Sequence, residues 1–420
     1  MVSRELVNET LNHRQADRVP VDLGGSVLTG MNVSTVYKLR QALKLDPPGT
    51  PVKVIDVFQM LGEIKPDLQA AVGGDVVNVS LPYTIFGYAN VDWKPWTTFD
   101  GTPVLVPGGF NTEPDEEGNL LQYPQGDRSA PPSGKMPKGG FYCDAIVRQD
   151  PIDEDSLDPA DNLEEFQPVS DADLAALKTR MEKAFNETDK AIVMNLPGMA
   201  FGDIAFVPAP SLKHPKGIRD IEEWYMSTAA RKDYVTAVFE GQCEIALANL
   251  ERLHAAVGDM PTAVVVSGTD FGAQNGPFVS PRAFKTLYMP YMRRINDWIH
   301  AHTTWKTFIH SCGSIMPLIP FMIEAGFDIL NPVQTSAENM DARELKAKFG
   351  DALTFWGGGA DTQHTLPTAT PDEIRREVKG VLETFAPGGG YMFAAIHNIQ
   401  HGVPAENLIA MFETVRDFKF

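Results

Sequence analysis

A chain of 420 residues with 43% hydrophobic and 22% charged side chains has the composition of a soluble globular enzyme, and it is long enough for one large α/β barrel. The formal net charge of −19 argues against nucleic acid or an anionic membrane as the main partner. Three cysteines provide no disulfide framework, so we expect a reducing compartment, the cytoplasm. The N-terminus lacks a signal-peptide pattern, and the most apolar stretch, 191–210, is interrupted by proline and aspartate, so we expect no membrane span.

Strand-like and helix-like patterns alternate along most of the chain, which predicts an α/β fold, a (β/α)8 TIM barrel. The first part contains a helix over 4–12, a strand over 18–25, a helix over 35–43 and a strand over 75–79. After residue 166, continuous apolar runs typical of strands buried on both faces alternate with amphipathic helices. The expected strands are 191–196, 262–267, 307–309, 328–331, 353–356 and 391–396, and the expected helices are 170–187, 231–253, 281–302, 316–324, 342–349 and 371–385.

Residues 82–166 have a different texture, dense in proline, glycine and acidic clusters, with short β-like pieces such as 100–107. A structureless loop of this length is improbable in a compact domain. We therefore predict an inserted β-hairpin-rich subdomain near the barrel mouth, with 1–81 and 167–420 forming the barrel. The insertion serves either as a lid over the site or as structural packing.

The stretch from Thr307 to Ser314 ends an apolar run in His310-Ser-Cys312-Gly. Residues two apart on a strand point to the same side, so His310 and Cys312 are expected to project together from one strand end. An imidazole beside a thiol forms half of a zinc site, although an ordinary buried pair has the same pattern. The chemistry of such barrels gathers at the carboxyl ends of the strands, and the site is expected there.

Other polar residues also follow the expected strands. His397 comes after the last strand and is the candidate third metal ligand, although it could also cap a loop. Asp270 is a candidate site carboxylate or helix cap, and Asn331 and Gln334 are candidate catalytic side chains. The remaining residues of this kind are Asp22 and Asp361 at strand ends, His364 and His401, which we interpret as loop residues, and Cys143 and Cys243, which are not expected to be ligands.

Several of these segments together resemble the uroporphyrinogen decarboxylase superfamily, over nearly the whole chain outside the insertion. Within it, the His310-Ser-Cys312 motif resembles the zinc-dependent, corrinoid-linked methyltransferases, in which a later cysteine completes the zinc site. At the corresponding position this chain has His397. The other matching pieces are Asp17-Arg-Val-Pro-Val21, 272–281, Ile329-Leu-Asn-Pro-Val-Gln334, Met340-Asp341 with Leu345-Lys346, Phe349-Gly-Asp351 and Val403-Pro-Ala-Glu-Asn-Leu408.

The resemblance implies methyl transfer between a small methylated substrate, a methoxy compound or a thiol, and a corrinoid (cobalamin) supplied in trans by a partner protein. Zn²⁺ would be held by His310, Cys312 and His397, with one position open for substrate. Asp270 would be a resting fourth ligand or would orient the substrate. Replacing a thiolate by an imidazole leaves zinc more positive, which favours methoxy compounds. A homodimer is compatible with the sequence.

Two other functions are consistent with the same residues. A cofactor-free carboxy-lyase resembling the decarboxylases would act on an acidic tetrapyrrole or a smaller acid, and it would need arginines around the mouth. A non-catalytic barrel would keep a metal or ligand without an open coordination position, since one fold hosts many functions.

Overall fold

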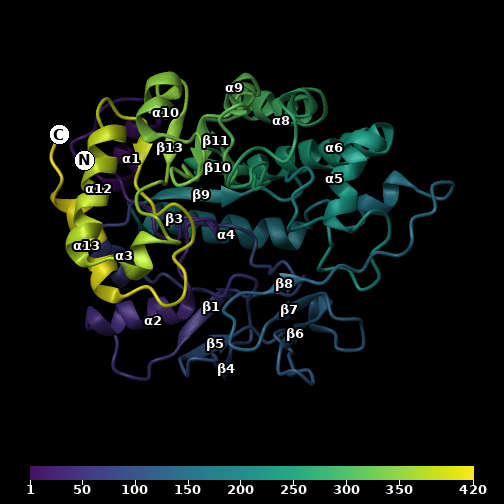
Figure 1. Ribbon diagram of the computed structural model, residues 1–420, viewed down its shortest axis with the longest axis horizontal. Coiled ribbons are helices and arrows are strands. Elements are labelled where there is room, and N and C mark those ends of the chain that lie inside the picture. Colours follow the sequence, from purple (N-terminus) through teal and green to yellow (C-terminus); the bar gives the residue numbers. More distant parts are fainter.

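The computed structural model describes residues 1–420 and contains a curved sheet of seven parallel strands (Figure 1). The sheet order is β14-β13-β12-β11-β10-β9-β3, so each strand lies beside its neighbour in the chain. This succession of parallel strands with helices between them is the pattern of a (β/α)8 barrel, and it confirms the predicted fold class. The strands are β3 (Val76–Asn78), β9 (Ala191–Asn195), β10 (Ala263–Ser267), β11 (Lys306–His310), β12 (Ile329–Asn331), β13 (Thr354–Trp356) and β14 (Tyr391–Met392).

The eighth position of the barrel is occupied by a single residue, Val21. It forms parallel bridges to Phe393 beyond β14 and to Gly74 before β3, so it connects the two edges of the seven-stranded sheet. The backbone N–H of Asp22 donates to the carbonyl of Phe393, and the carbonyl of Val21 accepts from Asp75. The strand predicted over 18–25 is therefore present as the closing element, but it is too short to count as a regular strand. Pro20, which has no N–H to donate, limits its ladder.

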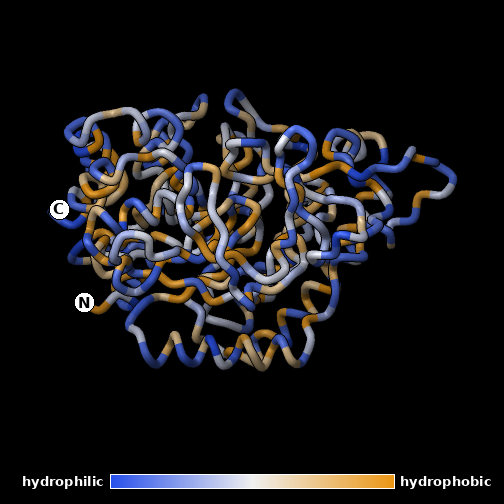
Figure 2. Tube along the Cα trace, turned by 90° about the horizontal axis from the view of Figure 1, so that it is seen from below, coloured by the Kyte–Doolittle hydropathy of each residue, from blue (hydrophilic) through white to orange (hydrophobic).

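The inside and outside of the barrel are packed by different residues. A cluster of 12 buried residues fills the interior, and it includes Phe308 of β11 and Trp356 of β13. Alternate residues of the same strands belong to a larger cluster shared with the surrounding helices, so both strand faces are buried, as the apolar runs predicted. Val7 and Leu11 of the first helix also pack into the interior cluster. Hydrophobic stretches accordingly lie inside and hydrophilic loops outside in Figure 2.

Helices cover the outer face of the barrel. Several begin at the polar residue that the sequence places there: Ser170 accepts from the N–H of Asp173, and Thr370 forms a capping box with Glu373. None of the helices combines the length and apolar character needed to cross a membrane. The helices are α1 (Ser3–Leu11), α2 (Val33–Ala42), α3 (Pro66–Val72), α4 (Asp171–Glu187), α5 (Ile221–Ala230), α6 (Lys232–Val257), α7 (Pro281–Ala283), the π-helical turn η3 (Phe284–Tyr288), α8 (Met289–His302), α9 (Ile319–Glu324), α10 (Ala342–Phe349), α11 (Thr365–Thr368), α12 (Pro371–Phe385) and α13 (Ala405–Asp417), with 3-10 turns η1 (Pro124–Gly126) and η2 (Pro159–Leu163).

The proline- and glycine-rich segment forms two small sheets that lie below the barrel sheet in Figure 1. One has the order β2-β1-β5-β4 and the other β6-β7-β8. The first sheet includes residues 52–62, which the sequence analysis assigned to the barrel, because β1 pairs in parallel with β5. Its strands are β1 (Val52–Asp56), β2 (Leu61–Gly62), β4 (Lys94–Thr97) and β5 (Pro103–Val106), and those of the second sheet are β6 (Leu120–Gln122), β7 (Gly134–Met136) and β8 (Asp144–Ala145).

Candidate metal centre

His310 and Cys312 lie at the carboxyl end of β11. Phe308 faces the barrel interior, so His310, two residues later, points the same way and is only 2% exposed. The chain leaves the strand at Ser311, whose N–H donates to the carbonyl of Asn331 on β12. The Cys312 Sγ lies 3.3 Å from the His310 Nε2 atom. The two side chains therefore project together, as the spacing predicted.

The ring of His310 has a fixed orientation. Its Nδ1 lies 2.6 Å from Oδ1 of Asn331, and the Asn331 amide N–H donates to the carbonyl of Trp356 at 2.8 Å. Because the Asn331 N–H group is engaged with Trp356, its oxygen faces the ring and accepts a hydrogen bond from Nδ1–H of His310. The lone pair of the ring is then on Nε2, the atom that faces Cys312. The contacts continue to the first strand position, where the Trp356 indole N–H donates to Oδ2 of Asp22.

Asp270 follows β10 and lies against the same pair. Its Oδ1 accepts the backbone N–H of Cys312 at 2.7 Å and lies 3.7 Å from Nε2 of His310. The carbonyl of Asp270 accepts from the Tyr225 hydroxyl at 3.1 Å. Burial, and then the charge of Asp270, raise the pKa of the Cys312 thiol well above its usual value. The raised pKa favours the protonated thiol, and a cation bound to the sulfur would instead favour the thiolate.

His397 reaches the pair from the loop after β14. Its ring centroid lies 5.4 Å from that of His310, with the ring planes at 65°. Burial, and then the neighbouring His310, lower the pKa of His397 to about 4, so the imidazole is neutral and able to donate a lone pair. The neighbouring Asn398 is fully buried and bonds to Gly30, Val27 and Gln59, which fixes the loop.

The three side chains fit a zinc ion. Their ligand atoms all lie within 4.8 Å of one another. Tetrahedral zinc with bonds of about 2.0–2.3 Å separates its ligand atoms by about 3.6 Å, so only small movements are needed. Imidazole nitrogens and a cysteine thiolate are ligands that zinc prefers. The structure thus brings together the residues predicted as metal ligands, His310, Cys312 and His397.

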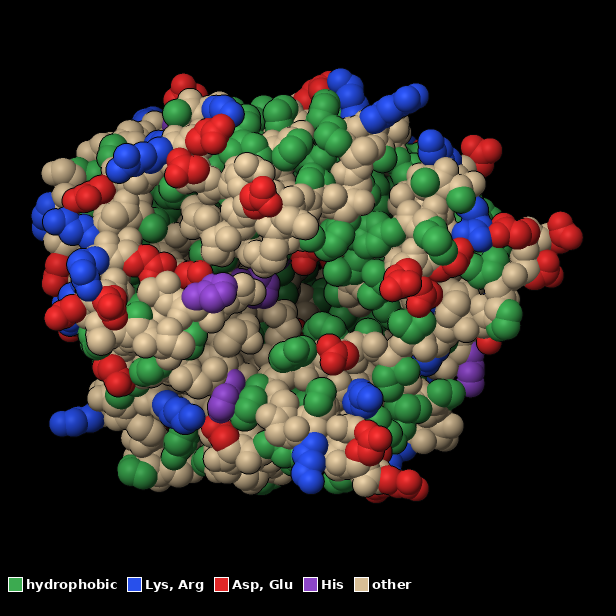
Figure 3. Space-filling model, viewed as in Figure 1, with side chains coloured by type: hydrophobic (Ala, Val, Ile, Leu, Met, Phe, Trp, Pro, Cys, Tyr) green, Lys and Arg blue, Asp and Glu red, His purple; other side chains and the backbone are tan.

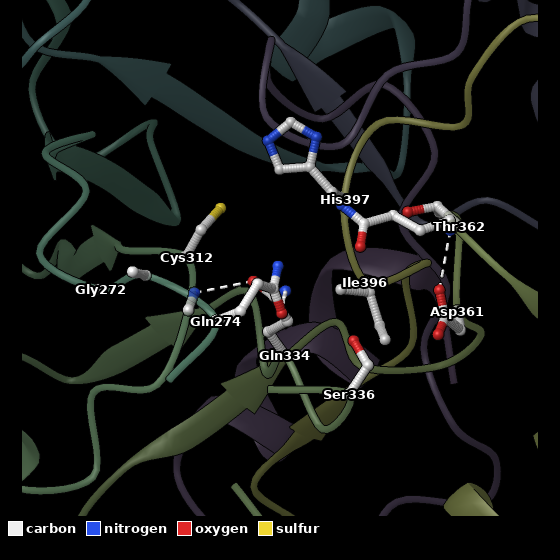
Figure 4. A pocket seen from close by; sticks show the side chains of 12 residues that line it. Gly272, Gln274, Cys312, Gln334, Ser336, Asp361, Thr362, Ile396 and His397 are labelled. Carbon is white, nitrogen blue, oxygen red and sulfur yellow. Dashed lines mark hydrogen bonds between the residues drawn. The ribbon is translucent and has the colours of Figure 1, made fainter. Parts of the chain in front are cut away.

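A cavity of about 430 Å³ opens beside the triad (Figure 4), and Cys312 and His397 form part of its wall. Figure 4 shows the Cys312 sulfur and the His397 ring on one side, with Gln334 and Ser336 on another. Gln334 accepts the N–H of Gly313 through Oε1 at 2.7 Å, so it braces the turn after Cys312. The cavity is also lined by Gln274, Asp361, Thr362 and Gln363.

The remaining predicted residues are neither metal ligands nor part of the cavity wall. Asn331 does not line the cavity, and both ends of its amide group are engaged. His401 stacks on Phe141 of the insertion and bonds to Asp100, and His364 is 75% exposed beside Asp361, so both are loop residues as predicted. Cys143 and Cys243 are buried outside the triad.

Two features of the site escaped the sequence analysis. Asn398 was not singled out, although it follows a predicted ligand and is fully buried. Asp203, on the loop after β9, is a second acid beside the site: burial, and then the nearby Asp270, raise its pKa to about 7. Its position after a strand was a signal, since strand ends carry the other polar side chains.

Comparison with known proteins identifies similar chains. The model of the uroporphyrinogen decarboxylase (URO-D) family matches residues 156–418. A uroporphyrinogen decarboxylase from Ralstonia nicotianae is 26% identical over 271 residues, which covers 60% of this chain and 70% of the relative. Another from Pseudoalteromonas atlantica is 23% identical over 211 residues, covering 46% of this chain and 56% of the relative. The matched region thus spans little more than half of the second relative.

Among solved structures, a methyltransferase from Methanosarcina mazei has a similar fold. The TM-score is 0.57 at 16% sequence identity, and the match covers 100% of this chain and 99% of the other. A likeness at this level of identity is a likeness of fold. It extends to the whole chain, including the small sheets outside the barrel.

Proposed function

The chain belongs to the uroporphyrinogen decarboxylase family, and within this family we propose that it is a zinc-dependent methyltransferase. It would move a methyl group between a small methylated substrate, a methoxy compound or a thiol, and a corrinoid carried on a partner protein. The fold shared with a methyltransferase is compatible with this activity. The observation that carries the proposal is the convergence of His310, Cys312 and His397 at the edge of a cavity large enough for a small molecule.

Each residue near the triad has a distinct proposed role. Asn331 holds the proton on Nδ1 of His310, so that Nε2 remains free to bind a metal. Asp270 fixes the backbone of Cys312 and is close enough to the triad to orient a bound substrate. Gln334 supports Gly313 and, from the cavity wall, contacts the substrate. Asn331 thus acts through His310, Asp270 acts at the triad, and Gln334 acts at the cavity wall.

A zinc ion held by the triad would supply Lewis-acid activation of the oxygen or sulfur atom that carries or receives the methyl group. The partner's corrinoid would supply the cobalt that accepts or donates it. The protein's own contribution is to hold the substrate in line with the incoming cofactor and to restrict water. With only one thiolate among three ligands, the metal keeps more positive charge than with two, and we therefore place methoxy compounds ahead of thiols as substrates.

The first test is metal content and its dependence on the triad. We expect purified protein to hold close to one zinc per chain, and His310→Ala and Cys312→Ser to lose it together with activity. Cys243→Ala is the matched control, because this thiol is buried in α6 outside the triad. Zinc-free protein with full activity would rule out the metal-dependent mechanism.

The second test is methyl transfer itself. Zinc-loaded protein is incubated with methylcobalamin and thiols, and separately with reduced cobalamin and methoxy compounds. We expect the cobalamin spectrum to change in at least one arm, and not with the Cys312→Ser variant. An unchanged spectrum in both arms would contradict the methyltransferase proposal.

The curated relatives favour one alternative, a cofactor-free carboxy-lyase. It predicts carbon dioxide release from an acidic tetrapyrrole by metal-free protein. The cavity has no lysine or arginine in its wall to bind the carboxylates of such a substrate, which is why we place it second. Turnover of uroporphyrinogen after zinc removal would reverse this order.

A further inference from the structure

The wall of the cavity is rich in polar residues but contains no lysine or arginine. Twelve residues line it, three of them hydrophobic and none of them lysine, arginine, phenylalanine, tyrosine or tryptophan. In Figure 3 the hollow at the centre of the face has histidine and acidic side chains near its edge, while lysine and arginine lie toward the periphery. A carboxylate entering this space would find no cationic partner in the protein wall.

Two acidic side chains add to the lack of lysine and arginine at the site. Asp361 is part of the wall, and Asp270 lies against the triad. Asp361 lies beside the exposed His364, whose Nδ1 is 3.1 Å from the carboxylate. A zinc ion with one thiolate ligand carries a single positive charge, which the two aspartates more than balance. An anionic substrate is therefore opposed, and a neutral or cationic one is not.

The wall also offers hydrogen bonds that the protein does not use. Gln274 accepts from Gln334 through its oxygen, but its amide N–H groups donate to no protein atom, and the side chains of Ser336 and Gln363 have no partner. Such groups bind a polar ligand and lose free energy when an apolar one displaces their water. The wall contains no phenylalanine, tyrosine or tryptophan on which an aromatic substrate could stack, and its one aromatic ring is the imidazole of the proposed ligand His397.

We propose that the cavity takes small, non-aromatic methyl donors that are neutral or cationic and that bear hydrogen-bonding groups, and that it discriminates against carboxylates. This inference rests on the proposed function, since it names the substrate class of the same site. The selectivity comes from Asp361 and Asp270 together with the absence of a cation in the wall. The unpaired donors of Gln274, Ser336 and Gln363 provide the contacts to the substrate.

Three probes of nearly equal size test the charge preference: 2-methoxyethanol, 2-methoxyethylamine and methoxyacetate. Binding to zinc-loaded protein is measured by ligand-observed NMR titration. We expect the neutral and ammonium probes to bind at least about tenfold more tightly than methoxyacetate. Methoxyacetate binding as tightly as 2-methoxyethanol would overturn the proposal, and so would the absence of binding by both other probes.

The substitution Asp361→Asn tests how much the charge of this carboxylate contributes to the preference between the probes. It keeps the side-chain oxygen that accepts from the N–H groups of Gln363 and His364, so the turn is preserved. We expect the preference for the ammonium probe over methoxyacetate to shrink several-fold, with the affinity for 2-methoxyethanol changing least of the three. Asp372→Asn, 87% exposed on α12, is the control and should change nothing. An unaltered preference in Asp361→Asn would contradict the assigned role.

Binding and methyl transfer are read separately. If 2-methoxyethanol binds with the expected preference but the cobalamin spectrum does not change, the methyltransferase proposal fails while the charge selectivity stands. If cobalamin is methylated by methoxyacetate at least as efficiently as by the other two, the charge selectivity fails while methyl transfer stands.

Discussion

The two histidines of the triad are held in different ways. His310 is the last residue of β11, its backbone is in register with Asn331 of β12, and its ring bonds to the Asn331 side chain. His397 lies on a loop, and its ring has no hydrogen bond to the protein; the adjacent Asn398 holds the backbone instead. The ring of His310 is oriented by a hydrogen bond that its own side chain makes to Asn331, whereas His397 is positioned only by the backbone of its loop. The metal site therefore combines a fixed half, held by a hydrogen bond to a ligand ring, with a half that has no such bond.

The largest expected effect is removal of either ring. His310→Ala and His397→Ala should each lower zinc affinity by at least about a hundredfold, because two remaining ligands rarely hold the ion. Affinity is measured by competition with a chromophoric chelator. His401→Ala is the matched control: it lies four residues from His397 and bonds to Asp100 outside the triad. If His401→Ala lost zinc as His397→Ala does, damage to the loop rather than loss of a ligand would explain both.

A smaller effect is expected from the residue that orients His310. Asn331→Ala removes the acceptor for Nδ1, and substitutions of this kind cost about 10–100-fold in metal affinity. Asn331→Asp keeps an acceptor for His310 but cannot donate to the carbonyl of Trp356. We expect it to retain more zinc affinity than Asn331→Ala. Equal losses in the two variants would show that packing, not the hydrogen bond to the ring, is what matters.

The corresponding test on the loop side is Asn398→Ala. It removes three hydrogen bonds that hold the loop, and we expect zinc affinity to fall about tenfold because the ring of His397 must be ordered on binding. Gln59→Ala removes only one of these bonds and should have a smaller effect. A loss in Asn398→Ala as large as in His397→Ala would mean that the loop no longer brings the ligand to the site.

The difference between the strand side and the loop side of the site also determines which features could be predicted from the sequence. The alternation of strands and helices was predictable from local hydrophobic patterns. The shared direction of the His310 and Cys312 side chains was predictable because residues two apart on a strand point to the same side. His397 was predicted from its place after the last expected strand, and the family resemblance then matched it with the later cysteine ligand. Asn398 holds the loop through bonds to Val27 and Gln59, which lie more than 300 residues earlier in the chain. β1 pairs with β5 through residues such as Val52 and Val104, which are also far apart in sequence. No local sequence pattern indicates such contacts.

The length of the short closing element at Val21 was also not predictable from a local sequence pattern. A strand was predicted over 18–25, but the length of the ladder is set by the neighbours, Phe393 and Gly74, with which it pairs. The polar wall of the cavity could not be predicted because its members come from several loops and have no shared sequence period. Gln274, Ser336 and Gln363 lie after three different strands and meet only in space.

The smallest expected effect concerns the two acids beside the fixed half. The Asp270 carboxylate accepts the N–H of Cys312, whereas Asp203 accepts only the N–H of Ala205 and has a pKa raised to about 7, mainly by burial. Since the folded-state pKa lies above the unfolded value of about 3.8, the folded protein binds a proton that the unfolded chain releases. Stability then falls as the pH rises from about 4 to about 7, and the full penalty remains above that range.

Asp203→Asn removes this penalty while keeping an oxygen for the N–H of Ala205. Relative to the wild type, the variant should be little changed at pH 4.5 and more stable at pH 8, by about 1–2 kcal/mol, because the buried amide group recovers only part of the ionisation cost. Urea unfolding of metal-free protein at the two pH values measures the difference, with Asp171→Asn, 99% exposed, as the control. The same change in stability at both pH values would mean that Asp203 is ionised throughout, and the acid beside Asp270 would then add to the negative charge that selects the substrate.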